Sequence, residues 1–257
     1  MKLYFLGTCS GTEPFLDRNH ASFALQTGGN LYFFDAGEGC SKTAHLLGLD
    51  LMATQCVVIS HPHMDHVGGL TNHLWTVRKL MRAYGRTPLF DCLRVYVPCK
   101  ETWDGVMMIL HNTEGNFVSP SYPLEGKTYA AGVLFDDGRV RVTAYPNTHI
   151  RCNEGEVRSY SFLIECEGKR IVYSGDLKSY SELDAAIGEG CDAVIGETGH
   201  HKIIDVLAYV SKKSIGSFYF THHGREILND RAAAEERVAS LFEGRAQIAY
   251  DGMTVEV

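Results

Sequence analysis

Apolar residues occur along the chain in short runs that predict strands first and then alternating strands and helices. Between residues 70 and 84, apolar side chains recur at helical spacing, which predicts an amphipathic helix. The turn Gly28-Gly29-Asn30 separates two early apolar runs and predicts a hairpin. Together, the early hairpins and the later alternation predict two β-sheets covered by helices.

The elements expected from this pattern fall into two classes. The expected strands are Lys2–Gly7, Ser22–Thr27, Leu31–Phe34, Cys56–Ser60, Leu93–Val97, Thr128–Phe135, Arg139–Tyr145, Tyr160–Cys166, Arg170–Ser174, Ala193–Ile195, Ser217–Thr221, Gln247–Tyr250 and Thr254–Val257. The expected helices are Ser41–Leu47, Leu70–Tyr84, Glu101–His111, Lys202–Lys213 and Asp230–Phe242, whereas Asn112–Gly126 is expected to be a loop. We find no linker and no repeat, so we expect a single domain over residues 1–257.

Composition narrows the class of protein. The chain has 257 residues, 45% hydrophobic and 21% charged, as in globular proteins. A formal net charge of −7 argues against an extended nucleic-acid-binding surface, and no apolar run is long enough to span a membrane. Eight scattered cysteines without a C-x-x-C pair, and an N-terminus without the features of a secretory signal peptide, predict a cytoplasmic protein with reduced thiols.

Four residues that can bind metal ions lie in the short segment His61-Pro62-His63-Met64-Asp65-His66. The segment follows a predicted buried strand, and α/β proteins place their chemistry at the carboxyl ends of such strands. On a tight loop, alternate residues face different ways. One pair can therefore serve one metal ion and the other pair a second ion about 3.5–4 Å away.

Three later strands also end in a potential ligand. His149, Asp176 and His222 each lie within four residues of the end of a predicted strand. A lone histidine at a strand end is more often structural than a ligand. Four strand ends with such residues predict one rim at which a dinuclear centre is assembled.

In these motifs the sequence resembles the metallo-β-lactamase-fold hydrolase superfamily, and the resemblance covers nearly the whole chain. It implies an α/β fold with a four-layer αββα sandwich and two divalent metal ions, Zn²⁺ or alternatively Mn²⁺ or Fe. It assigns the first ion to His61, His63 and His149, the second ion to Asp65, His66 and His222, and both ions to a bridging Asp176. Asp35 is expected to orient one of the histidine ligands.

Within the superfamily the chain is similar to the phosphodiesterase branch that includes RNase Z. The N-terminal strand and glycine turn at residues 6–14 resemble that branch, and so does Asp192–Thr198, which resembles its strand ending in a Glu-x-Thr type element. The resemblance makes His200 the candidate general acid, with the adjacent His201 as the alternative. RNase Z inserts a long tRNA-clamping arm between the third histidine and the bridging aspartate, whereas here His149 and Asp176 are only 27 positions apart.

These features predict a phosphodiesterase of small substrates. Hydroxide shared by two metal ions would attack a small phosphodiester such as a cyclic nucleotide or cyclic phosphate, with Asp65 orienting or deprotonating the nucleophile. The same centre can also hydrolyse a lactone, thioester or β-lactam, which is the main alternative, and tRNA 3′ processing is a weaker one. A homodimer is expected by analogy with the branch, through the helix Leu70–Tyr84.

Overall fold

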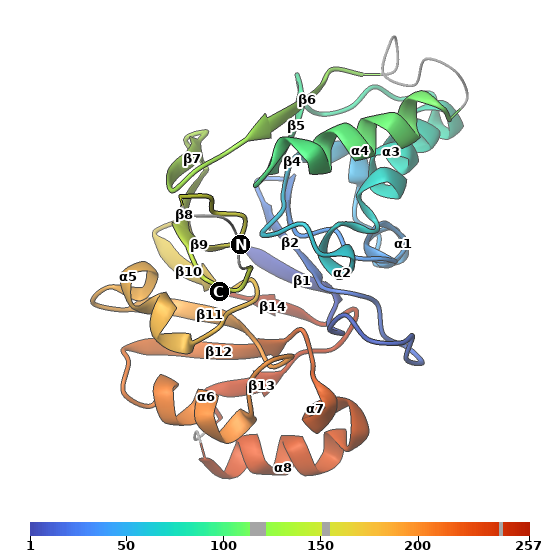
Figure 1. The fold of residues 1–257 in the computed structure, drawn as a ribbon. Helices are drawn as coiled ribbons and strands as arrows, with labels where there is room; N and C mark the ends of the chain where they lie inside the picture. The colour runs from blue at the N-terminus through green and yellow to red at the C-terminus, as the bar shows by residue number, and fades with distance from the viewer. Residues whose placement is uncertain (114–121, 151–154, 242–243) are drawn as a thin grey trace.

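Two seven-stranded β-sheets face each other in the computed structural model, which describes residues 1–113, 122–150, 155–241 and 244–257 (Figure 1). The first sheet has the order β14-β1-β2-β3-β4-β5-β6, with β1 Lys2–Gly7, β2 Ser22–Thr27, β3 Asn30–Phe34, β4 Thr54–Val58, β5 Leu93–Val97, β6 Leu124–Thr128 and β14 Thr254–Glu256. The second has the order β13-β12-β11-β10-β9-β8-β7, with β7 Gly132–Asp136, β8 Val140–Pro146, β9 Tyr160–Cys166, β10 Lys169–Tyr173, β11 Cys191–Glu197, β12 Ile215–Thr221 and β13 Ala246–Ile248.

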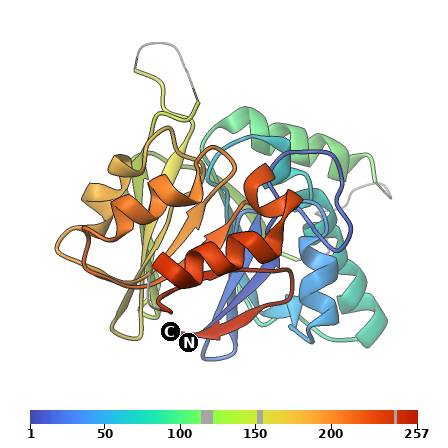
Figure 2. The same cartoon turned by 90° about the horizontal axis from the view of Figure 1, so that it is seen from below.

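Helices cover the outer face of each sheet (Figure 2). The helices on the first sheet are α1 Cys40–Leu46, η1 Leu51–Ala53, α2 Met64–Val67, α3 Leu70–Tyr84 and α4 Lys100–His111. The second is covered by η2 Tyr180–Leu183, α5 Asp184–Ile187, α6 Ile203–Val210, α7 Arg225–Asn229 and α8 Arg231–Leu241. This arrangement confirms the predicted αββα sandwich.

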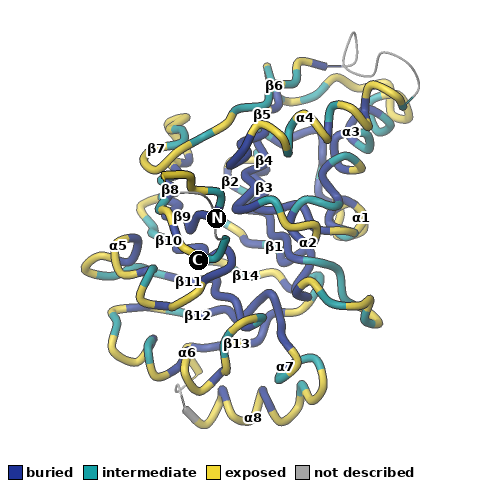
Figure 3. The backbone as a smooth tube through the Cα atoms, in the orientation of Figure 1, coloured by how far each residue is buried: buried dark blue, intermediate teal, exposed yellow. Residues whose placement is uncertain are grey.

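Alternating side chains along the strands build the layers. In β3, Phe33 packs toward the helices while the next residue, Phe34, packs against the other sheet, because successive strand residues point to opposite faces. Three buried clusters result, one between the sheets and one under each helical layer. Figure 3 shows the same distribution, with buried strands inside and exposed helix surfaces outside.

The expected strand Thr128–Phe135 is wrong, because two strands of different sheets occupy this region. β6 ends at Thr128 on the edge of the first sheet, and β7 begins at Gly132 on the edge of the second. Gly132 has φ of 114°, a conformation open to glycine, and the chain changes sheets there. The expected loop Asn112–Gly126 is wrong at its end, where β6 begins, and residues 114–121 lie outside the described part.

The other expected elements agree with the structure apart from shifts at their ends. The bounds of α3, β5 and β9 are those expected, and the long terminal helix is α8, although Phe242 lies outside the described residues. Among the described residues, no helix combines the length and the apolar content needed to cross a bilayer.

Replacing His73 by leucine is expected to raise the free energy of unfolding by about 1–2 kcal/mol. His73 is buried in α3 against Phe33, and neither ring nitrogen has a hydrogen-bond partner among the described residues. Burial lowers the pKa of His73 to about 4, from an ordinary value of 6.5. The folded state therefore favours the neutral ring, and the stability from this preference is present above pH 6.5 and is lost as pH falls toward 4.

Urea unfolding of metal-free protein at pH 7.5 and pH 5.5 tests this prediction, with exposed His111→Leu as the matched control. The advantage of His73→Leu over the parent should widen at the lower pH. A destabilised His73→Leu would show that the ring is better accommodated than its contacts indicate.

Candidate metal centre and its relatives

The segment 61–66 lies at the carboxyl end of β4. β4 ends at Val58, the N–H of the next residue, Ile59, donates to Tyr96 O, and α2 begins at Met64 with His63 as its N-cap. β10, β11 and β12 run parallel to one another, and β8 runs in the same direction as β10, so their carboxyl ends meet at the same edge. The topology therefore brings all seven predicted ligands together.

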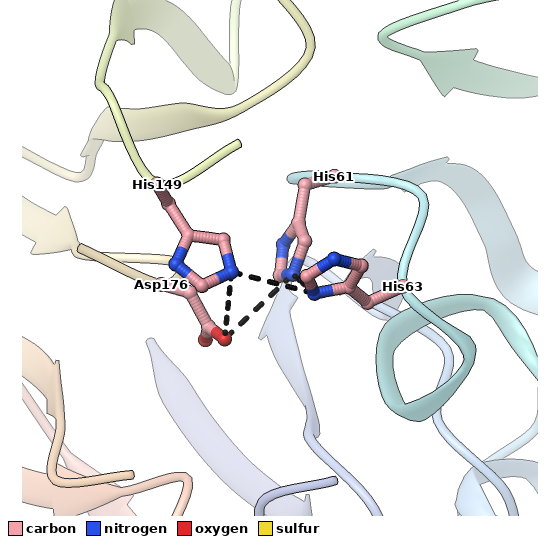
Figure 4. Close-up of side chains that lie close together, drawn as sticks. All are labelled: His61, His63, His149 and Asp176. Carbon is pink, nitrogen blue, oxygen red and sulfur yellow. Dashed lines mark hydrogen bonds and ion pairs between the residues drawn. The ribbon is translucent and has the colours of Figure 1, made fainter. Parts of the chain in front are cut away.

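Four of these residues form a first group, shown in Figure 4. His61 Nε2 and His149 Nε2 lie 3.1 and 3.3 Å from His63 Nδ1. They lie 3.7 and 3.6 Å from Asp176 Oδ2. His61 and His63 enter from the first sheet, and His149 and Asp176 enter from the second.

The other oxygen of Asp176 belongs to a second group. Asp176 Oδ1 lies 3.3 Å from both His66 Nε2 and His222 Nε2. Asp65 Oδ2 lies 3.0 Å from His222 Nε2 and 3.4 Å from His66 Nε2. The carboxylate of Asp176 thus faces both groups with different oxygens, which is the arrangement of a bridging ligand.

These distances fit divalent metal ions. A tetrahedral ion with ligands at about 2.0–2.1 Å keeps those ligands about 3.3–3.4 Å from one another. His66 Nε2 and Asp176 Oδ1 are buried and have no hydrogen-bond partner among the described residues, although such atoms are rarely left unpaired. A set of imidazoles and carboxylates without thiolates suits Zn²⁺ and also Mn²⁺ or Fe.

Charges at the centre are strongly coupled. Burial alone would raise the pKa of the Asp176 carboxyl, but His222 and His66 outweigh it and hold that pKa well below its usual range. Burial lowers the pKa of His61, and the neighbouring His66 lowers it further. Burial would also lower the pKa of His222, yet Asp176 and Asp65 raise it to about 10. In the absence of metal, protons on His222 and His66 balance the buried carboxylates.

Asp35 is fully buried and lies against His66, as the resemblance implies. Its Oδ2 accepts hydrogen bonds from His66 Nδ1 at 2.7 Å, Tyr173 OH at 2.5 Å and Ser60 Oγ at 2.8 Å. Its Oδ1 accepts the Ser60 N–H at 2.6 Å. Asp35 therefore fixes the His66 ring so that Nε2 points into the second group.

Asp35 and His222 share an unusual backbone conformation. Their φ angles are 56° and 47°, in the left-handed region that non-glycine residues seldom adopt. Such conformations cost about 1–3 kcal/mol each and persist where surrounding contacts hold them. At both positions the turn directs the side chain toward the centre.

His200 lies at the edge of the centre. Its Nδ1 lies 3.0 Å from Glu197 Oε1, and its backbone N–H donates to Glu197 Oε2 at 2.9 Å. Its ring packs beside those of His149 and His222, with centroid distances of 4.8 and 5.8 Å. His201 instead directs Nε2 to Leu177 O at 3.1 Å.

Glu197 is the residue whose role the sequence reasoning missed. Besides its bonds to His200, it accepts the Leu177 N–H at 3.0 Å and lies 3.8 Å from His222 Nδ1. Its hydrogen bond raises the pKa of His200, so that this ring stays protonated to a higher pH than an ordinary histidine. The position of Glu197 at the end of a parallel strand next to the ligand-bearing β12 was the feature that could have identified it.

Comparison of the sequence with protein families identifies the family of this chain. Residues 1–241 match the family described as "Anti-Pycsar protein Apyc1". The chain belongs to the Apyc1 family.

Relatives of this Apyc1-family chain agree with its fold. It is 26% identical over 151 residues to a ribonuclease Z of Methanothermobacter thermautotrophicus, covering 58% of this chain and 45% of that protein. It is 25% identical over 290 residues to the ribonuclease Z of Mycobacterium marinum, covering 100% and 99% of the two chains. The structure of human tRNase Z, short form, superposes with a TM-score of 0.76 at 18% identity, covering 100% and 99%.

The chain spans about half the length, or less, of several curated relatives that it matches. These comparisons confirm the predicted superfamily and its RNase Z-like relatives, and one of the structures with this fold is described as a metal-dependent hydrolase.

Proposed function

We propose that this chain is a phosphodiesterase that hydrolyses a small phosphodiester, such as a cyclic nucleotide or cyclic phosphate, at a centre of two divalent metal ions. The observation that carries the proposal is the pair of four-residue groups joined by Asp176, with a histidine–glutamate pair at their edge. A phosphodiester needs a nucleophile, two charge-neutralising contacts and an acid for its leaving group, and this arrangement offers each of them.

In this proposal the first ion is held by His61, His63 and His149, and the second by Asp65, His66 and His222, with Asp176 shared. When bound, two such ions supply hydroxide at neutral pH and neutralise charge on the phosphate. Zn²⁺ is the ion we expect, with Mn²⁺ or Fe as alternatives.

Side chains of the protein then transfer the protons of the reaction. Asp65 orients or deprotonates the attacking water with the carboxylate that also contacts His222. As the new P–O bond forms and the old one breaks, His200 gives its proton to the leaving alkoxide. Glu197 holds His200 Nδ1 and so leaves Nε2 of the same ring for that transfer, which favours His200 over His201.

Two features support a small substrate. The net charge of −7 is unsuited to gripping an extended nucleic acid. Between His149 and Asp176, β9 and β10 pair as a hairpin and occupy most of the stretch in which RNase Z has its arm.

Hydrolysis of bis(p-nitrophenyl) phosphate by protein reloaded with Zn²⁺ or Mn²⁺ tests the proposal. We expect metal-dependent release of p-nitrophenolate, and His63→Ala should lower kcat/KM by about 100-fold or more together with the metal content, because first-group ligation is broken. His111→Ala, at an exposed histidine of α4, is the matched control.

A lactone and thioester panel and a tRNA precursor serve as competing substrates. Turnover of the acyl substrates alone would transfer the chain to the lactonase or thioesterase class. Selective 3′ cleavage of the tRNA precursor would contradict the small-substrate assignment.

A further inference from the structure

Two of the predicted ligands of the first group lie on loops that strand pairing does not join directly. His149 follows β8 and Asp176 follows β10, and β9 lies between these two strands in the second sheet. Figure 4 shows the two side chains approaching each other from their separate loops. Since His149 Nε2 lies 3.6 Å from Asp176 Oδ2, contacts other than strand pairing must hold the loops together.

The carboxylate of Glu182, in η2, contacts both loops. Its Oε1 accepts hydrogen bonds from the backbone N–H and the hydroxyl of Thr148, at 2.8 and 2.6 Å, in the loop that carries the histidine. Its Oε2 accepts the backbone N–H groups of Lys178 and Ser179, at 3.0 and 3.2 Å, in the loop that carries the aspartate. One side chain therefore joins the two ligand loops, with a different oxygen for each.

Part of this arrangement is ordinary helix capping. Ser179 and Glu182 form a capping box at the start of η2, in which the glutamate accepts the N-cap N–H. The two bonds from Thr148 lie outside that motif, and they are the shortest of the four. Partial burial alone would raise the pKa of Glu182, but the hydrogen bonds that it accepts, those of Thr148 first, lower it. The carboxylate therefore stays charged at neutral pH.

Asp176 has supports that do not involve Glu182. The N–H groups of Ser174 and Leu177, on either side of it, donate to acceptors in β11 at 3.0 Å each. These bonds come from the strand next to β10 and are independent of η2. Asp176 should therefore keep its place when the Glu182 carboxylate is removed.

The support of His149 is weaker. Its N–H donates to Asn147 Oδ1 at 3.2 Å, and Asn147 Nδ2 donates to Ser161 Oγ in β9, also at 3.2 Å. That hydroxyl donates to Ser174 O at 2.6 Å, which completes a second and longer connection between the two loops. Without Glu182, His149 should keep its loop but lose its direct connection to the loop of the aspartate.

We propose that Glu182 is a positioning residue for the first metal ion, because it holds His149 at the distance from Asp176 that one ion requires. The inference rests on the proposed two-ion centre, and Glu182 is not one of its seven ligands. His149 belongs only to the first group, whereas Asp176 has its own supports. Removing the carboxylate should therefore weaken binding of the first ion and spare the second.

Titration of metal-free protein with Zn²⁺ against a competing chelator tests this role through the two dissociation constants. Glu182→Gln keeps the shape of the side chain but turns an amide NH₂ group toward N–H and O–H donors. We expect it to raise the Kd of one ion by about 10–100-fold and to leave the other near its parental value. Thr148→Val keeps the capping box and should weaken the same ion to a smaller extent. Glu189→Gln, at an exposed glutamate after α5, is the matched control.

The variant His63→Ala identifies the ion that Glu182 serves, because it removes a ligand of the first group only. In that background we expect a single Zn²⁺ ion to remain, and adding Glu182→Gln should leave its Kd unchanged. A rise in this Kd would assign the effect to the second ion and overturn the inference.

The outcomes separate this inference from the centre on which it rests. Parental values of both Kd in Glu182→Gln and Thr148→Val, or an equal rise of both, would overturn the role of Glu182 and leave the two-ion centre standing. A role in capping η2 alone would lower the free energy of unfolding in urea and change neither Kd, which would also overturn it. A parent chain that binds fewer than two Zn²⁺ ions would overturn the centre and the inference together. Because no turnover is measured, failure of the phosphodiesterase assignment would leave these results unaffected.

Discussion

Asp176→Asn is expected to remove nearly all activity, by about 1,000-fold in kcat/KM, and to lower metal occupancy of both groups. Asp176 is almost completely buried, and each of its oxygens faces a different group. An amide keeps the shape of the side chain but loses the charge that both ions would share. It also removes the main counter-charge of His66 and His222, so protons and metal ions alike are held less tightly.

Metal content by mass spectrometry and turnover of bis(p-nitrophenyl) phosphate measure both effects in one preparation. Asp205→Asn, on the exposed surface of α6, is the matched control. An Asp176→Asn variant with two ions per chain and parental turnover would rule out a bridging role.

His200→Ala is expected to lower kcat by about 10²–10⁴-fold on a substrate with an alkoxide leaving group, while the metal content stays unchanged. The loss should be much smaller for a p-nitrophenyl ester, because p-nitrophenolate leaves without a proton. The dependence on leaving group separates a lost proton donor from a damaged metal centre.

The pH profile adds a second criterion. The hydrogen bond to Glu197 raises the pKa of His200, and a general acid works only in its protonated form. Parental kcat on the alkoxide substrate should therefore fall as pH rises through this raised pKa, and His200→Ala should lack that limb. His201→Ala is the control, and loss of the limb in that variant instead would transfer the role to His201.

The sequence was sufficient to predict helices and strands whose apolar spacing is set by neighbouring residues. The apolar spacing of residues 70–84 predicted α3 at its observed bounds, and the residues that follow β4, β8, β10 and β12 were predicted to meet at one rim. This works because parallel strands place their carboxyl ends together, so a residue's place after a strand locates it in space. The assignment of these residues to metal ions stays a prediction, as does the single-domain organisation.

What the sequence could not supply depends on contacts between distant segments. The change of sheet between Thr128 and Gly132 leaves no mark in a run of alternating apolar residues, since both strands share the same period. The function of Glu197 follows from its contacts with His200 and Leu177, which only the packed fold brings together. The missing hydrogen bonds of His73 likewise became visible only when α3 was placed on β3.

The division of the seven residues between the sheets links metal binding to folding. His61, His63, Asp65 and His66 belong to the first half of the sandwich, whereas His149, Asp176 and His222 belong to the second. In the proposed dinuclear centre, ions held between them would cross-link the halves without a covalent bond and would stabilise only the closed sandwich. A metal ion present at 100 times its dissociation constant adds about 2.7 kcal/mol to the stability of such a state. If the proposed ions bind, the concentration of free metal would therefore set part of the free energy that holds the two sheets together.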